Sequence, residues 1–175
     1  MKKSMELDNL FRLDGMVIVV TGASGLLGRK HVEAIAAFGG TPILLDLNQK
    51  FIDKIVADIN KKFHVDAVGF ELDITNEKEV KKNAKTLVKR FGKIDALVNN
   101  AANNPKIEDN KTKKFSRLEN FKLDSWNQDI LVGLTGAYFC SKHYGSEISK
   151  NFHGGVIVNI SSDLGLIAPD QRLYT

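Results

Sequence analysis

Hydrophobic and polar positions along the chain follow two alternating patterns. Five short apolar runs rich in β-branched residues, at 16–20, 41–47, 67–72, 94–99 and 156–160, predict strands that are buried on both faces. Between them, segments 25–38, 50–61, 77–91 and 124–150 carry apolar residues at helical spacing. Strands that alternate with helices predict βαβ units. We therefore expect an α/β fold with a doubly wound parallel sheet and helices on both faces.

Two regions depart from this rhythm. Pro105 and the lysine-rich run 108–114 predict a long loop over 103–121, which is either a substrate-side lid or a surface insertion. After Ser161 only fourteen residues follow, fewer than a further βαβ step requires. We interpret 1–175 as a single domain whose C-terminal strands are missing from this chain.

Composition and charge narrow the possible functions. The net charge is +4, but the lysines are scattered, so nucleic-acid binding is not indicated. Cys140 is the single cysteine, and His31, His64, His143 and His153 have no metal-ligand spacing, so we expect no metal site. No apolar leader and no membrane-length apolar run occurs, and we expect a cytoplasmic protein without membrane contact.

A glycine-rich turn joins the first predicted strand to the first helix. Gly22, Gly25 and Gly28 form G-x-x-G-x-x-G in the strand–turn–helix context that a dinucleotide site requires. Glycines let the backbone approach a pyrophosphate, and the helix N-terminus stabilises the anion. We therefore expect a dinucleotide-binding domain.

An acidic residue ends the second strand at the appropriate interval. Asp46 lies eighteen positions after Gly28, where a carboxylate accepts hydrogen bonds from the adenosine ribose and repels the extra phosphate of NADP. No Arg or Lys follows until Lys50. The spacing favours NAD, and a helix cap is the alternative role for Asp46.

With these residues, the chain resembles the short-chain dehydrogenase/reductase family from about Leu13 to Ile160, which implies a Rossmann-type fold. Leu72-Asp73-Ile74-Thr75 is similar to the family segment whose Asp binds the adenine amino group; here the alternative for Asp73 is a helix cap. Asn99-Asn100-Ala101-Ala102 resembles the family's N-N-A-G, which implies cofactor contacts at Asn100 and Ala101. The resemblance also extends the expected cofactor contacts to Ser24, Leu27, Leu47, Ile74 and Ile160.

The same resemblance implies catalytic residues near the last predicted strand. Val156 to Ser162 reads V-I-V-N-I-S-S, which places the family's catalytic serine at Ser162. A hydroxyl there would orient the substrate and stabilise developing alkoxide charge. The family's later Tyr-x-x-x-Lys is incomplete here: Tyr174 and Thr175 fit its first two residues, and the chain stops before a lysine. In a subgroup with a longer insertion, Tyr174 would instead line the substrate entrance.

One position inside the matched region differs from the family. Val132-Gly133-Leu134-Thr135-Gly136 resembles V-N-L-x-G, with Gly133 in place of the asparagine whose main-chain carbonyl holds a water of the proton relay. Glycine also supplies a carbonyl, and in mid-helix it lowers stability by on the order of 1 kcal/mol relative to Ala. We expect a local kink that exposes the Gly133 carbonyl.

Four segments, at 103–106, 116–121, 132–136 and 162–172, together resemble bacterial dehydrogenases of flagellin and surface-polysaccharide sugar biosynthesis. This resemblance implies a phosphorylated or nucleotide-linked sugar as the small-molecule substrate, with Lys106, Lys113, Lys114, Arg117 and Arg172 as candidate phosphate contacts. It also implies a homodimer or homotetramer formed through the helix at 124–150. The leading hypothesis is an NAD-dependent oxidoreductase acting on an alcohol or ketone. The alternatives are a dinucleotide-binding module without turnover and a sugar epimerase or dehydratase.

Overall fold

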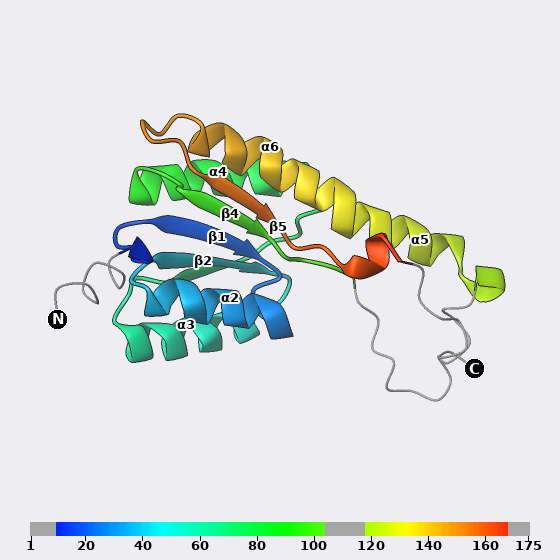
Figure 1. Cartoon of the computed structure of the whole chain (residues 1–175), viewed down its shortest axis with the longest axis horizontal. Coiled ribbons are helices and arrows are strands. Elements are labelled where there is room, and N and C mark those ends of the chain that lie inside the picture. Colours follow the sequence, from blue (N-terminus) through cyan, green and yellow to red (C-terminus); the bar gives the residue numbers. More distant parts are fainter. Residues whose placement is uncertain (1–9, 104–117, 168–175) are drawn as a thin grey trace.

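The computed structural model describes residues 10–103 and 118–167, which form a parallel sheet covered by helices (Figure 1). The strand order is β3-β2-β1-β4-β5, and all four pairings are parallel. The five strands are β1 (Val17–Thr21), β2 (Thr41–Asp46), β3 (Val68–Glu71), β4 (Ala96–Asn99) and β5 (Val156–Asn159). This sheet confirms the predicted α/β, Rossmann-type fold class.

Helices connect consecutive strands and lie on both faces of the sheet. They are α2 (Leu26–Ala37), α3 (Gln49–Phe63), α4 (Glu77–Phe91), α5 (Leu123–Ile130), a π-helical segment η2 (Leu131–Gly136) and α6 (Ala137–Ile148). Short 3₁₀ turns, η1 and η3, occupy Leu118–Asn120 and Asp163–Gly165. Helices α2 and α3 cover one face, and α4 and α6 cover the other (Figure 1).

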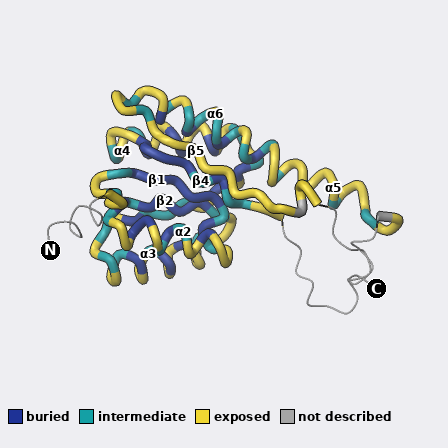
Figure 2. The backbone as a smooth tube through the Cα atoms, viewed as in Figure 1, coloured by how far each residue is buried: buried dark blue, intermediate teal, exposed yellow. Residues whose placement is uncertain are grey.

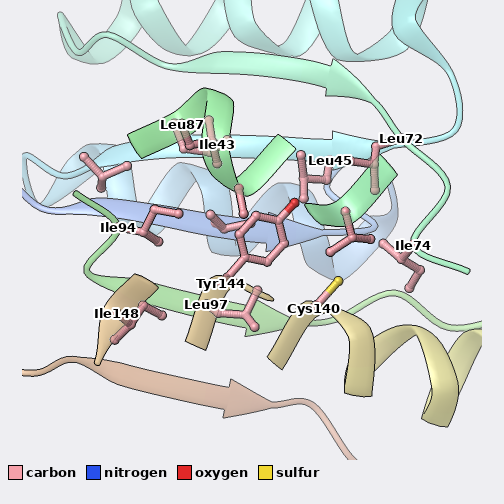
Figure 3. Close-up of a cluster of buried hydrophobic side chains, with 14 residues drawn as sticks. Ile43, Leu45, Leu72, Ile74, Leu87, Ile94, Leu97, Cys140, Tyr144 and Ile148 are labelled. Atoms are coloured by element: carbon pink, nitrogen blue, oxygen red, sulfur yellow. The ribbon is translucent and has the colours of Figure 1, made fainter. Parts of the chain in front are cut away.

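Alternating side chains of the central strand, β1, pack into two separate hydrophobic cores. Val17 and Val19 of β1 pack toward α4 and α6, whereas Ile18 and Val20 pack toward α2 and α3. This division follows from the two-residue period of a strand and explains why β1 is apolar at nearly every position. In the first core the Tyr144 ring lies among aliphatic side chains, with Cys140 nearby (Figure 3).

The long helix predicted for 124–150 is not a single α-helix. The chain enters α5 at Leu123, and η2 separates α5 from α6 over Leu131–Gly136, so the expected irregularity at Gly133 coincides with a π-helical stretch. A π-helix widens the turn and shifts the helical register, which is why a simple 3.6-residue period could not describe the segment. Of the predicted loop, 104–117 lies outside the described residues.

The outermost strand, β5, differs from the rest of the sheet in its exposure (Figure 2). All five residues of β1 are buried, whereas all four residues of β5 are exposed. Within the described part of the chain, β5 pairs only with β4. Its apolar composition, V-I-V-N, is nevertheless that of a buried strand.

No helix in the described ranges is both long and apolar enough to cross a membrane. Within the same ranges no cluster of three His, Cys, Asp or Glu side chains could hold a metal ion.

Candidate functional site

A cavity of about 470 Å³ opens where β1, β2 and β4 end. The strand order reverses at β1, so this crevice lies where open α/β sheets bind their ligands. The residues that line it are Gly22, Ser24, Gly25, Leu26, Leu27, Gly28, Leu45, Asp46, Leu47, Leu72, Asp73, Ile74, Asn100, Ala101, Ala102 and Val132. The cavity therefore gathers every expected cofactor contact except Ile160.

The glycine turn is packed so closely that its backbone forms one wall of the cavity. Gly22 has φ of +62°, and a Cβ there would lie 2.9 Å from the Ala101 Cα. A Cβ on Gly28 would lie 2.1 Å from the Gly22 carbonyl oxygen, and the Gly25 amide donates to that same oxygen at 3.2 Å. Any side chain at Gly22 or Gly28 would therefore displace the turn.

The N-terminus of α2 is open toward the cavity. Its N-cap residue is Gly25, which has no side chain to cap the helix, and the first turn carries no acidic residue. Since the first helical N–H groups have no partners within the helix, they and the helix dipole favour an anion at this end. The packed glycines and this open helix end suit a pyrophosphate.

Asp46 is held rigidly beside the glycine turn. Its Oδ2 accepts a hydrogen bond from the Ser24 amide at 2.9 Å, and its Oδ1 accepts one from the Leu47 amide at 2.8 Å. The alternative role as a helix cap does not hold, because Asn48 is the N-cap of α3 and its Oδ1 accepts from the Phe51 amide. The carboxylate lines the cavity where a ribose would lie in the predicted arrangement.

Asp73 also lines the cavity, in the turn after β3. Its Oδ1 accepts from both the amide and the hydroxyl of Thr75, at 2.8 and 2.7 Å. Here too the alternative of a helix cap is wrong, since Asn76 caps α4. Ile74 is buried at 8% exposure and lines the cavity, so it offers an apolar contact next to the Asp73 carboxylate.

Asn100 ties the segment after β4 to the glycine turn. Its side-chain amide donates to the carbonyl oxygens of Thr21 at 2.9 Å and Gly22 at 3.2 Å. In return, the Thr21 hydroxyl accepts from the amides of Asn100 and Ala101. The two strand ends that form the cavity are thus fixed to each other by side-chain hydrogen bonds.

Two of the expected catalytic residues, Ser162 and Gly133, do not line the cavity. Ser162 follows β5, is exposed, and its hydroxyl donates to the Asp163 carboxylate at 3.3 Å. Gly133 lies in η2, and a Cβ there would meet no atom within 4 Å, so packing does not demand glycine at this position. Its neighbour Val132 lines the cavity. Tyr174 lies outside the described residues.

Tyr138 and Lys142 of α6 also have Tyr-x-x-x-Lys spacing, although neither was among the predicted site residues. This pair precedes Ser162, whereas the family's pair follows its serine. Lys142 Nζ lies 5.8 Å from the centre of the Tyr138 ring and forms an ion pair with Glu77 at 2.8 Å. The Glu77 carboxylate raises the pKa of Lys142, and hydrogen bonds from Lys142 and His143 lower the pKa of Glu77. A catalytic lysine that assists tyrosine deprotonation is not tied to a carboxylate on an exposed helix face, so we assign this pair no catalytic role.

Five lining residues were not among the predicted contacts: Leu26, Leu45, Leu72, Ala102 and Val132. Four of them are neighbours in sequence of predicted residues at the glycine turn or at strand ends, so a wider window around each motif would have included them. Val132 lies in η2, far along the chain from the glycine turn, and reaches the cavity only through the tertiary fold.

Comparison with known proteins gives a consistent result. The short chain dehydrogenase family matches residues 16–174. D-threitol dehydrogenase of Mycolicibacterium smegmatis is 28% identical over 171 residues, which are 98% of this chain and 62% of that protein. A 3-oxoacyl-[acyl-carrier-protein] reductase of Synechocystis is 31% identical over 166 residues, 93% of this chain and 62% of that protein.

Among solved structures, an NAD⁺-bound xylitol dehydrogenase superposes with a TM-score of 0.80 at 29% identity. The match covers 93% of this chain and 58% of that one. The chain thus spans about 60% of the length of these three proteins.

Proposed function

Because the chain belongs to the short chain dehydrogenase family, we propose that its cavity binds a nicotinamide dinucleotide and that the whole protein is an NAD-dependent oxidoreductase. The observation that carries this proposal is the cavity in which the glycine turn, the open N-terminus of α2 and the Asp46 carboxylate meet. When bound, the nicotinamide would exchange a hydride with an alcohol or ketone carbon.

The arrangement around Asp46 supports NAD rather than NADP. Two backbone amides hold the carboxylate beside Ser24, so it cannot swing away from an added ribose phosphate without losing both hydrogen bonds. The nearest following cation in the sequence, Lys50, lies in α3 and is exposed. A phosphate at the ribose would therefore meet a fixed negative charge.

Three residues are proposed for the chemistry. Ser162 orients the substrate oxygen by a hydrogen bond and stabilises negative charge that develops on it. The main-chain carbonyl of Gly133, in η2, holds a water of the proton relay. Tyr174 is the proposed proton donor and acceptor, a role that needs a nearby lysine to lower its pKa.

For the substrate we propose a polyol or sugar. The names of two relatives, D-threitol dehydrogenase and xylitol dehydrogenase, refer to sugar alcohols and support this class. A phosphorylated or nucleotide-linked sugar would need cations near the substrate. The candidates Lys106, Lys113, Lys114, Arg117 and Arg172 all lie outside the described residues.

A second candidate is a dinucleotide-binding module without turnover. It is favoured by the positions of Ser162 and Gly133, neither of which lines the cavity. The epimerase or dehydratase alternative has less support, because the N-N-A-A segment at 99–102 resembles that of simple dehydrogenases.

The experiment is a fluorescence titration with NADH and NADPH, followed by a turnover assay with NAD and either D-threitol or xylitol. We expect NADH to bind more tightly than NADPH, and Asp46→Ala to narrow that difference. Asp53→Ala is the matched control, since Asp53 is an exposed carboxylate of α3 that pairs with Gln49. Equal binding of both nucleotides by the unmodified protein would refute the NAD preference, and binding without turnover of any polyol or sugar would favour the second candidate.

We also propose that the protein forms a homodimer or homotetramer through α5, η2 and α6. Leu123, Trp126, Leu134 and Tyr138 are large apolar or aromatic side chains along this helix, with 56–70% of their surface exposed. Such a stripe favours a protein partner over solvent. Light scattering of Leu134→Asp, compared with the unmodified protein, tests the proposal, and an unchanged oligomer mass would contradict it.

A further inference from the structure

A small polar cluster joins β4, β5 and α6 at the carboxyl end of the sheet. The Asn99 side-chain amide donates to the Ser141 hydroxyl at 3.0 Å and to the Asn159 side-chain carbonyl at 2.9 Å. Both hydrogens of the Asn99 amide are thereby used, one toward a helix and one toward a strand. Asn99 and Asn159 are also direct register partners at the last position of their strands.

The cluster is not needed to hold these elements together. The preceding three residues of β4 already pair in register with β5, from Ala96 with Val156 to Val98 with Val158. Helix α6 is anchored by the buried side chains Cys140, Tyr144 and Ile148. The polar contacts therefore add precision at one point of the interface, where β5 ends.

The cluster also has a feature that disfavours a purely stabilising role. Asn99 is 6% exposed, and its Oδ1 is buried without a hydrogen-bond partner among the described residues. An unpaired buried carbonyl oxygen lowers the stability of a fold. Polar groups retained at such a cost often serve a site rather than the core.

The chain leaves this cluster directly toward the proposed catalytic serine. The Ile160 amide, two residues before Ser162, donates to the Asn99 carbonyl oxygen at 2.9 Å. Ser162 lies three residues after Asn159. The side chain of Asn159 and the backbone of Ile160, both bound to Asn99, thus fix the direction in which the chain departs.

Asn99 and Asn100 also connect this cluster to the glycine turn that lines the cavity. The side chain of Asn99 binds β5 and α6, whereas the side chain of Asn100 binds Thr21 and Gly22 of the glycine turn. Two consecutive asparagines thus join the segment that carries the serine to the turn that lines the cavity.

We propose that Asn159 is a positioning residue for Ser162, held in place by Asn99 and Ser141, so that the serine hydroxyl keeps a fixed distance from the dinucleotide cavity. This inference rests on the proposed function, because it assigns Asn159 a role in the geometry of that reaction. A reacting group that is misplaced by about 1 Å loses roughly 100-fold in rate.

The test is a double-mutant cycle in the full-length protein, with NAD and D-threitol or xylitol as substrates. We expect Asn159→Ala to lower kcat by about tenfold to 100-fold while the KM for NAD stays within about twofold. In a Ser162→Ala background, Asn159→Ala should cause no further loss, because it acts through the serine. The control is Asn151→Ala, which removes amide hydrogen bonds to Ile94 and Gly154 at the opposite end of the β4–β5 pair.

Amide hydrogen exchange gives a second readout that does not depend on turnover. Asn159→Ala should speed exchange over 160–163 by at least about tenfold and leave 21–28 unchanged. Faster exchange throughout the protein, an unchanged rate at 160–163, or additive losses of kcat in the cycle would each overturn the inference. A protein that binds no NADH refutes the proposed function instead, and the exchange result still decides the role of Asn159.

Discussion

Replacing Gly28 by alanine is the most direct test of how the glycine turn builds the cavity. The added Cβ would lie 2.1 Å from the Gly22 carbonyl oxygen and 2.9 Å from the Ala23 Cα. Real Cβ contacts are essentially never shorter than 3.0 Å, and both obstacles are backbone atoms that cannot rotate away. The turn must therefore move by roughly 1 Å away from α2.

This displacement has two expected effects. Overpacking of a well-packed site costs about 1–3 kcal/mol of folding free energy. It also misaligns the amides at the start of α2, and each hydrogen bond to a charged group contributes about 1.5–3 kcal/mol. Loss of one such bond to the pyrophosphate corresponds to a tenfold to 100-fold weaker affinity for NADH, since about 1.4 kcal/mol is a factor of ten.

Fluorescence titration with NADH and urea denaturation measure the two effects separately. Gly145→Ala in α6 is the control, because Gly145 does not line the cavity and its Cβ would meet only the end of the Ile157 side chain, at 3.0 Å. We expect Gly145→Ala to bind NADH within a few-fold of the unmodified protein. If Gly28→Ala bound NADH as tightly as Gly145→Ala does, the turn would not form the cofactor site as described.

Three further predictions concern the core and the π-helical segment. Tyr144→Phe should lower the free energy of unfolding by about 1–3 kcal/mol, because the buried Tyr144 hydroxyl donates to Asn83 Oδ1 at 2.9 Å and the Asn83 oxygen would lose this donor. Urea denaturation measures the loss, with the exposed Tyr138→Phe as the control. A loss in Tyr144→Phe as small as in the control would contradict the prediction. Burial raises the pKa of the Cys140 thiol from 9.0 to about 12, so as pH rises the unfolded chain loses this proton before the folded chain does. The contribution of the thiol to folding stability should therefore be full below about pH 9 and fall as pH rises toward 12. Cys140→Ala should flatten this decline in denaturation measured against pH, and an equally steep decline in the variant would rule out the thiol as its cause. Gly133→Ala should raise the free energy of unfolding by up to about 1 kcal/mol, since the added Cβ meets no atom within 4 Å. Turnover should fall, because we expect glycine to favour the kink that exposes the carbonyl at this position; alanine keeps the carbonyl itself, so full turnover would count against the need for that kink.

Most of the fold could be predicted because each element carries its own local signal. The helix predicted at 77–91 has those bounds in the structure, since Asn76 caps its start and Gly92 adopts the left-handed conformation that ends it. The π-helical segment could not be predicted in the same way. Gly133 indicated an irregularity, but its type depends on how α5 and α6 pack against the rest of the protein.

The cofactor cavity was predictable for a similar reason, because Gly22, Asp46 and Asn100 lie at strand ends that a parallel sheet brings to one edge. The contact between Ser141 and Asn99 could not be predicted, since 42 residues separate them in sequence. The pattern of the predicted strand does not indicate which helix residue its last side chain contacts. Val132 likewise reaches the cavity from a helix remote in sequence. Such contacts follow from packing between elements, which periodicity does not encode.

The exposed strand β5 has a consequence for handling these 175 residues in isolation. Val156, Ile157 and Val158 are 36–51% exposed, and no proline or charged residue interrupts the strand. Natural sheets protect their edges with such residues because an open apolar edge recruits further strands from other molecules. If no other segment covers β5, the polypeptide should associate edge to edge as its concentration rises, and solubility should improve in Val158→Lys.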